Sequence, residues 1–174
     1  MKEIEITLDT KSITKAIKEI ERYKKLLDTK AERLRVRIAE LVKEKAQSGF
    51  DGSVVSVNKY TGDGYTSDIE VTWEDEDEKS VLVVARGDEV AFIEFGAGIH
   101  FNGTGSPHPD GERLGLTIGS YGEGKGNRDF WVYYNGEYKK EYTYGTQSTM
   151  PLYRALCDVA DDIVAIAREV FADD

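Results

Sequence analysis

The sequence predicts an α+β protein in which an antiparallel meander-type sheet packs against a long N-terminal helix and a C-terminal helix. Residues 12–48 lack glycine and proline and place apolar residues at helical spacing. Residues 53–95 alternate apolar and polar residues between turn signals, as antiparallel strands do. Residues 149–171 return to helical spacing. The chain has 174 residues, so we expect one domain spanning residues 1–174.

The first two elements are a short strand and the long helix. Residues 2–8 alternate apolar and acidic or polar side chains, which indicates a half-buried strand. Residues 12–48 as one helix would extend about 55 Å at 1.5 Å per residue. We therefore expect this helix to overhang the body or to bend near residues 28–29, leaving an apolar stripe that a neighbouring chain would cover. The stripe repeats at every seventh residue: Ile13, Ile20, Leu27, Leu34 and Leu41.

The meander and a glycine-rich segment follow. The strands are expected at residues 54–60, 65–73 and 81–86, with turns at residues 61–64 and 87–88. Residues 96–129 then hold ten of the 17 glycines of the chain, all between Gly96 and Gly126. A loop of this length in a compact domain is usually functional or mobile.

Residues 130–145 contain seven aromatic side chains around Asn135-Gly136, which predicts an aromatic hairpin with a tight turn. Ser148 or Thr149 would then cap the final helix, and Pro151 fits its first turn, where the missing amide hydrogen does no harm.

The net charge of −10 is unevenly distributed along the chain. Residues 1–48 carry 13 basic and 9 acidic side chains, whereas residues 49–174 carry 10 basic and 24 acidic ones. Tight nucleic-acid binding rests on Lys and Arg contacts with phosphate, so the acidic excess argues against it. We expect the basic helix of one copy, from Lys15 to Lys45, to lie against the acidic body of the next.

Other composition features exclude several classes of protein. The single cysteine, Cys157, cannot form an internal disulfide, and no Cys/His grid exists for a structural zinc ion. The chain shows no charged-then-apolar leader, and runs such as residues 81–85 fall far short of the roughly 20 apolar residues that span a bilayer. We expect a soluble protein of a reducing compartment, without a membrane partner.

Several motifs suggest chemistry but lack a required part. The glycines from Gly119 to Gly126 have the frame of a phosphate-binding loop, but without the Ser or Thr that holds magnesium or a following helix. His100, His108 and Asp110 could serve a small metal-dependent hydrolase, yet they lack the short fixed spacing of helical metal ligands.

Cys157 and the aromatic block at residues 130–144 each allow two interpretations. Cys157 fits an inert thiol near the core face of the last helix better than a nucleophile. The aromatic block at residues 130–144, including Trp131, could make the chain a carbohydrate-binding module, although strands and interfaces use the same residues.

Three segments, taken in order, resemble the tail-completion or neck proteins that join head and tail in long-tailed phages and prophages. They are Val90–Gly98 (VAFIEFGAG), Gly119–Tyr134 (GSYGEGKGN running into FWVYY) and Tyr144–Leu156 (YGTQSTMPLYRAL). The resemblance spans nearly the whole chain, and the sequence departs from it in a long insertion at residues 99–129.

The resemblance implies a curved antiparallel sheet that packs against the long N-terminal helix and the C-terminal helix. It also implies a structural role as an oligomeric ring component in the virion neck or tail, assembled in the host cytoplasm. The implied partners are copies of the chain and other neck or tail proteins, with DNA at most passing through the ring. It implies no catalytic residue, cofactor or metal. The implied fold and assembly positions are Phe92, Glu94, Phe95, Gly96 and Gly98 in a buried turn, Trp131 and Tyr133 in the hairpin, and Met150, Pro151 and Arg154 at the start of the last helix.

Overall fold

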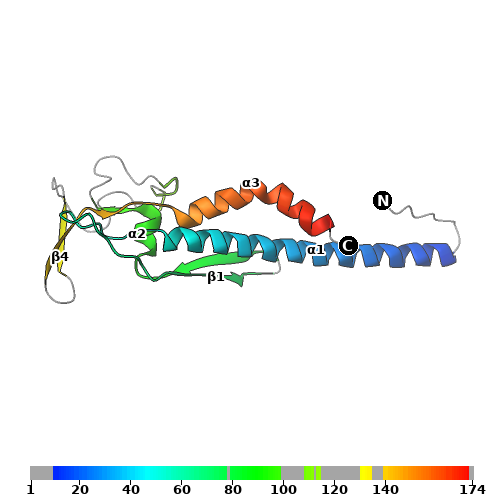
Figure 1. The fold of residues 1–174 in the computed structure, drawn as a ribbon. Coiled ribbons are helices and arrows are strands. Elements are labelled where there is room, and N and C mark those ends of the chain that lie inside the picture. Colours follow the sequence, from blue (N-terminus) through cyan, green and yellow to red (C-terminus); the bar gives the residue numbers. More distant parts are fainter. Residues whose placement is uncertain are drawn as a thin grey trace.

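One long helix, α1 (Thr10–Asp51), runs along most of the molecule (Figure 1). The computed structural model describes residues 10–77, 79–98, 108–111, 113–114, 130–134 and 139–172. Helix α3 (Pro151–Ala172) lies along the C-terminal half of α1, and a hairpin of β1 (Glu70–Asp75) and β2 (Val81–Arg86) lies along its other side (Figure 1). The expected long N-terminal and C-terminal helices are both confirmed, and they pack together.

The described residues form three small antiparallel sheets of two strands each. The first sheet is the β1–β2 hairpin. The second pairs β3 (Ala97–Gly98) with β6 (Gly145–Thr146), and the third pairs β4 (Trp131–Tyr134) with β5 (Lys140–Thr143). The aromatic hairpin therefore has the expected strand pairing, but the extended meander sheet expected over residues 53–95 is wrong.

The first expected strand of the meander divides its backbone bonds between two partners. Val55 exchanges both backbone hydrogen bonds with Tyr65, whereas Val57 donates to the carbonyl of Gly145 and accepts from the amide of Tyr144. Ser56 lies between them with a φ of 54°, in the left-handed region that interrupts a strand. A continuous ladder cannot form across such a residue.

The last part of the expected meander is helical. Val90–Phe95 forms the short helix α2, which buries Ile93 and Glu94. A six-residue apolar run does not distinguish a strand from one buried helical turn by its period alone. The structure places this segment under the start of α3 rather than beside β2.

The hydrophobic core lies between α1, α3 and the β1–β2 hairpin. Phe50 and Ile93 are among its largest fully buried side chains. Its buried members are Val42, Ala46, Phe50, Val55, Ile69, Val71, Ile93, Ala155, Val159 and Ile166. Leu34 and Leu41 of the heptad row pack against this core together with Ile38, so the row predicted from sequence lies on the core-facing side of α1 in its C-terminal half.

Two polar side chains of α1 hold the hairpin. The Gln47 side-chain amide donates to the carbonyl of Ile69 and accepts from the amide of Val71, both at 2.8 Å, which satisfies the two backbone groups at the start of β1. Arg35 donates to the backbone carbonyls of Asp77 and Ser80 at the hairpin turn, at 3.1 and 3.0 Å. The acidic residues at 74–77 are thus tied to α1 through the turn that follows them.

Three expected elements lie wholly or largely outside the described residues: the strand at residues 2–8, most of the glycine-rich segment at 96–129, and the turn at 135–136. Within the described part of the chain, no helix has both the length and the apolar character needed to cross a membrane.

Gly49 allows α1 to approach the first turn of α3. A Cβ atom there would lie 2.9 Å from Cβ and 3.3 Å from Cα of Pro151. We expect Gly49→Ala to lower the free energy of unfolding by about 1–2 kcal/mol, because the clash outweighs the gain in helix propensity. Urea unfolding measures this, with Gly52→Ala as control, since its added Cβ meets nothing closer than 3.5 Å. Unchanged or increased stability of Gly49→Ala would contradict the packing described.

Arg35 affects two acidic groups differently. Its side chain lowers the pKa of Glu32 through a direct hydrogen bond, whereas the pKa of Asp77 is lowered chiefly by the backbone amide of Lys79. We therefore expect Arg35→Gln to raise the pKa of Glu32 toward its usual value while that of Asp77 stays low, as measured by NMR titration of the carboxyl groups. Equal shifts of both groups would contradict this assignment.

Glu32 and Asp77 also make a contribution to stability that depends on pH. Because both carboxyl groups have a lower pKa in the folded than in the unfolded chain, the stability they contribute is present above the unfolded value and is lost as pH falls through the folded one. Arg35→Gln should therefore lose less stability than the unmodified protein on acidification through this range.

Candidate assembly surfaces

Two of the three segments that carry the resemblance, Val90–Gly98 and Tyr144–Leu156, meet at the start of α3. Strands β3 and β6 bring them together, with Ala97 opposite Thr146 and Gly98 opposite Gly145. The amide of Thr149 also donates to the carbonyl of Ile93 at 3.0 Å. Residues about fifty positions apart in the sequence thus form one junction.

Glu94 is the central side chain of this junction. Its carboxylate accepts hydrogen bonds from the amides of Leu152 and Tyr153, each at 2.9 Å, although only 3% of the residue is exposed. Amides in the first turn of a helix have no partner within the helix, and this end carries partial positive charge. Glu94 therefore caps α3 from a different helix.

The cap expected at Ser148 or Thr149 is wrong. Ser148 donates its hydroxyl to the carbonyl of Glu94 at 2.7 Å, and the hydroxyl of Thr149 pairs with that of Ser53, also at 2.7 Å. Both hydroxyls hold the connection to α2 and α1, because the carboxylate of Glu94 already occupies the amides that an N-cap would bind.

The other motif positions support the same junction. Gly96 has a φ of 84° and Met150 a φ of 54°, which turn the chain on either side of the β3–β6 pair. Pro151 is buried as the first residue of α3, whereas Arg154 is exposed. Phe92 and Phe95 are half-buried. Among these six positions, Arg154 is the exposed one.

His108 completes the surroundings of Glu94. Its Nε2 lies 3.3 Å from Oε1 of Glu94, and its Nδ1 accepts the amide of Asp110 at 3.0 Å. Its ring packs against those of Phe95 and Tyr153, at centroid distances of 4.6 and 5.0 Å. His108 is buried, which neither an exposed loop histidine nor an open metal ligand would be.

The other groups considered for catalysis are also engaged or outside the described residues. Asp110 accepts from Arg113 at 2.9 Å, and this bond lowers the pKa of Asp110. Cys157 is half-buried, and a hydrogen bond with it raises the pKa of Tyr153. His100 and the glycines at 119–126 lie outside the described residues. Among the residues that are described, no three His, Cys, Asp or Glu side chains are placed to hold a metal ion.

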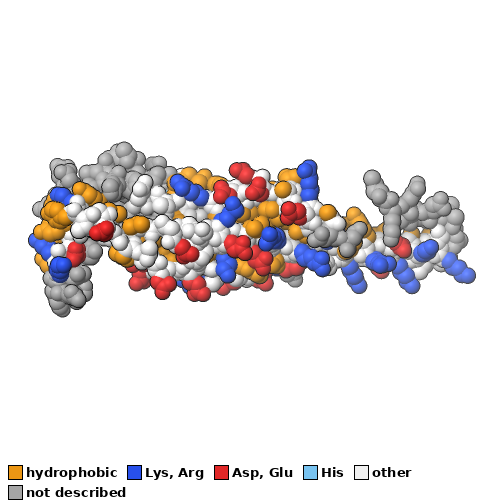
Figure 2. Space-filling model, viewed as in Figure 1, with side chains coloured by type: hydrophobic (Ala, Val, Ile, Leu, Met, Phe, Trp, Pro, Cys, Tyr) orange, Lys and Arg blue, Asp and Glu red, His pale blue; other side chains and the backbone are white. Residues whose placement is uncertain are grey.

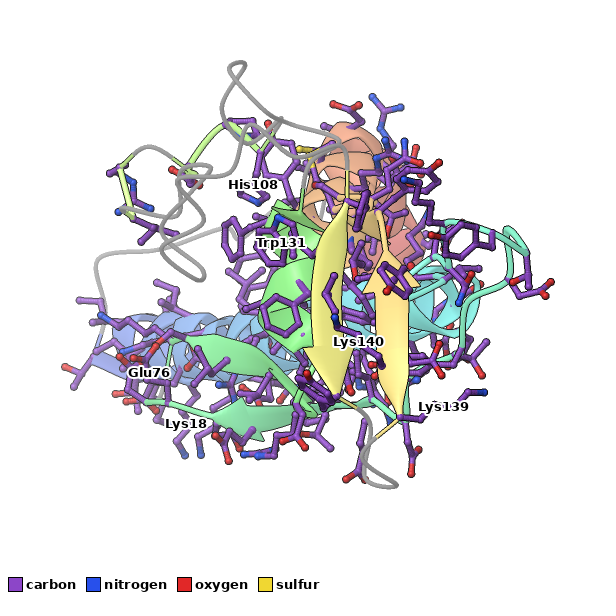
Figure 3. The ribbon with its side chains drawn as sticks, turned by 90° about the vertical axis from the view of Figure 1, so that its left-hand side faces the viewer. Lys18, Glu76, His108, Trp131, Lys139 and Lys140 are labelled. Carbon is purple, nitrogen blue, oxygen red and sulfur yellow. The ribbon has the colours of Figure 1, made fainter. Side chains whose placement is uncertain are left out.

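The aromatic hairpin forms the end of the molecule farthest from the start of α1 (Figure 1). Figure 3 looks onto this end, where Trp131 and Lys140 come from neighbouring strands. Phe130 packs on Tyr142, and the ammonium of Lys59 lies 3.7 Å from the centre of the Phe130 ring. Trp131 is half-buried, and the side chain of Tyr133 lies outside what the structure describes.

The opposite end is the N-terminal half of α1, which extends beyond α3 (Figure 1). The ammonium of Lys30 donates to the carbonyl of Phe171 at 2.9 Å, which marks where α3 ends along α1. We call residues 10–29 the projecting segment. Its apolar row of Ile13, Ile17, Ile20 and Leu27 is 37–56% exposed. The expected overhang is confirmed.

Helix α3 carries a second apolar row beside its buried one. Leu156, Ala160, Ile163 and Ala167 recur at intervals of four, three and four residues, which places them along one side of the helix. Leu156 is 60% and Ile163 43% exposed, while Val164 and Phe171 nearby are 59% and 40% exposed. We call these six residues the outer row of α3.

Comparison with known proteins assigned no relative: no protein-family model, curated protein or solved structure matches the chain.

Glu94→Gln tests the cap of α3. A glutamine side chain has one acceptor oxygen, and its amide hydrogens would face donors, so we expect a loss of about 1–3 kcal/mol in the free energy of unfolding. Hydrogen exchange at the Leu152 and Tyr153 amides should accelerate selectively. Glu169→Gln, at an exposed position of the same helix, is the control. Unaltered exchange at both amides would refute the capping role.

Proposed function

We propose that the chain is a non-enzymatic structural subunit of a phage or prophage neck, which completes the tail and helps to join it to the head as part of an oligomeric ring. The observation that carries this proposal is the projecting segment of α1. It presents a row of large apolar side chains that the described residues of its own chain leave 37–56% exposed. Such a row is a feature of surfaces that other proteins cover.

The junction at the start of α3 supports the resemblance on which the phage assignment rests. The segments VAFIEFGAG and YGTQSTMPLYRAL are far apart in the sequence, yet they form one structural unit through Glu94 and the β3–β6 pair. Their shared role is to fix the direction in which α3 leaves the junction. This role is structural, in keeping with a subunit that acts through its surfaces.

The proposed partners are further copies of the chain and the neighbouring neck and tail proteins, in the virion and in the host cytoplasm during assembly. The acidic body carries a net charge of −14 over residues 49–174. In a ring around the DNA path, acidic side chains that face the channel would repel phosphate and let DNA pass without binding. The finer details of the proposal, including the curved sheet that the resemblance implies, rest on that resemblance.

Negative-stain microscopy of the purified protein, alone and mixed with the products of neighbouring genes, tests the proposal. We expect closed rings, or ring-shaped complexes once a neck or tail partner is added. Static light scattering over a range of protein concentrations gives the mass independently. A protein that stays monomeric at high concentration and low salt, and that binds none of those products, would overturn the proposed function.

A further inference from the structure

The projecting segment of α1 continues a face that is covered elsewhere in the same helix. Ile13, Ile20 and Leu27 stand at seven-residue intervals before Leu34 and Leu41, which pack against the core. Helix α3 covers α1 only as far as Lys30, where the backbone of Phe171 is bound. The apolar face thus extends past the end of α3, where Ala16 is buried but Ile13, Ile20 and Leu27 stay 37–56% exposed.

The outer row of α3 matches the projecting segment in length and in the spacing of its apolar residues. The projecting segment has 20 residues, from 10 to 29, and α3 has 22. At 1.5 Å per residue they extend about 30 and 33 Å. Each presents an apolar row with i, i+4, i+7 spacing, Ile13-Ile17-Ile20 on one and Leu156-Ala160-Ile163 on the other, which is the pattern by which two helices pack along their length.

Charge distinguishes between the two ways in which copies can pair. The projecting segment holds six basic and three acidic side chains, so two such segments side by side would bring like charges together. Helix α3 holds four acidic and two basic side chains. Figure 2 shows basic groups gathered along the far end of α1 and acidic groups over the body. The acidic residues of α3 are Asp158, Asp161, Asp162 and Glu169.

We infer that the projecting segment of one copy packs along the outer row of α3 of a second copy. The inference rests on the proposed assembly role and names the two surfaces that carry it. The contact is heterologous, since each copy offers a different surface on each side. Repetition of such a contact gives a ring if the rotation closes and an open filament if it does not.

Complementation between two monomeric variants tests this contact. Ile20→Asp alters the projecting segment and Ile163→Asp alters the outer row; both positions are exposed, so the fold of each subunit should survive, as circular dichroism verifies. Each variant alone should associate at least about tenfold more weakly. An equimolar mixture should form a one-to-one dimer and no larger species, because one intact contact remains between the two variants.

Leu82→Asp is the matched control, because Leu82 is 46% exposed on β2 and belongs to neither surface. It should assemble as the unmodified chain does. Assembly equally sensitive to Leu82→Asp would overturn the inference.

Cross-linking locates the contact independently of its direction. Ile20 lies near the middle of the projecting segment and Ile163 near the middle of α3, so they meet whether the two run parallel or antiparallel. In a Cys157→Ser background, a bismaleimide should join Ile20→Cys chains to Ile163→Cys chains and should not join Ile20→Cys chains to one another. Chains carrying both cysteines should give a ladder of multimers.

The outcomes separate the inference from the proposed function. Cross-links between two Ile20→Cys chains would overturn the heterologous contact in favour of pairing between projecting segments. Assembly that persists in both aspartate variants would overturn this contact and leave the ring proposal standing. A chain that forms no assembly, alone or with neck and tail partners, would overturn both.

Discussion

The buried carboxylate of Glu94 at the start of α3 is the interaction on which the arrangement of this protein depends. A buried charge is costly unless hydrogen bonds satisfy it. Here two helix amides do so, and His108 lies 3.3 Å away. Lys30 binds the carbonyl of Phe171 at the C-terminal end of α3. A negative side chain therefore lies at the positive end of the helix dipole, and a positive side chain lies at its negative end. These two contacts fix both the position and the extent of α3 along α1.

The length over which α3 covers α1 determines which surface of α1 is available for assembly. Because α3 reaches only as far as Lys30, no other helix among the described residues lies beside the N-terminal half of α1. The hairpin is likewise confined to the C-terminal half by Gln47 and Arg35. The chain therefore combines a well-packed body with a helix that exposes apolar side chains, and this combination, rather than a pocket with reactive groups, is what supports a structural role.

The sequence predicts the regular elements well where the pattern is long. Both long helices follow from unbroken apolar periodicity, and β2 spans residues 81–86 as expected. The meander fails for local reasons: Ser56 takes a left-handed conformation, and Val90–Phe95 is too short for its period to separate a helical turn from a strand. Glu94 was singled out by resemblance, but its capping role depends on residues 58 positions away. An acidic residue inside an apolar run is the signal for a buried, paired charge. No pattern in the sequence indicates that His108 is buried or that Arg35 binds the backbone of the hairpin turn.

In the proposed assembly, a second copy of the chain covers the projecting segment of α1. Hydrogen–deuterium exchange at increasing protein concentration measures this directly in the unmodified chain. We expect protection to rise over residues 10–29 and along α3 as the mass of the particle increases, while β2 stays unchanged. A particle that grows in mass while exchange over residues 10–29 remains constant would contradict the account.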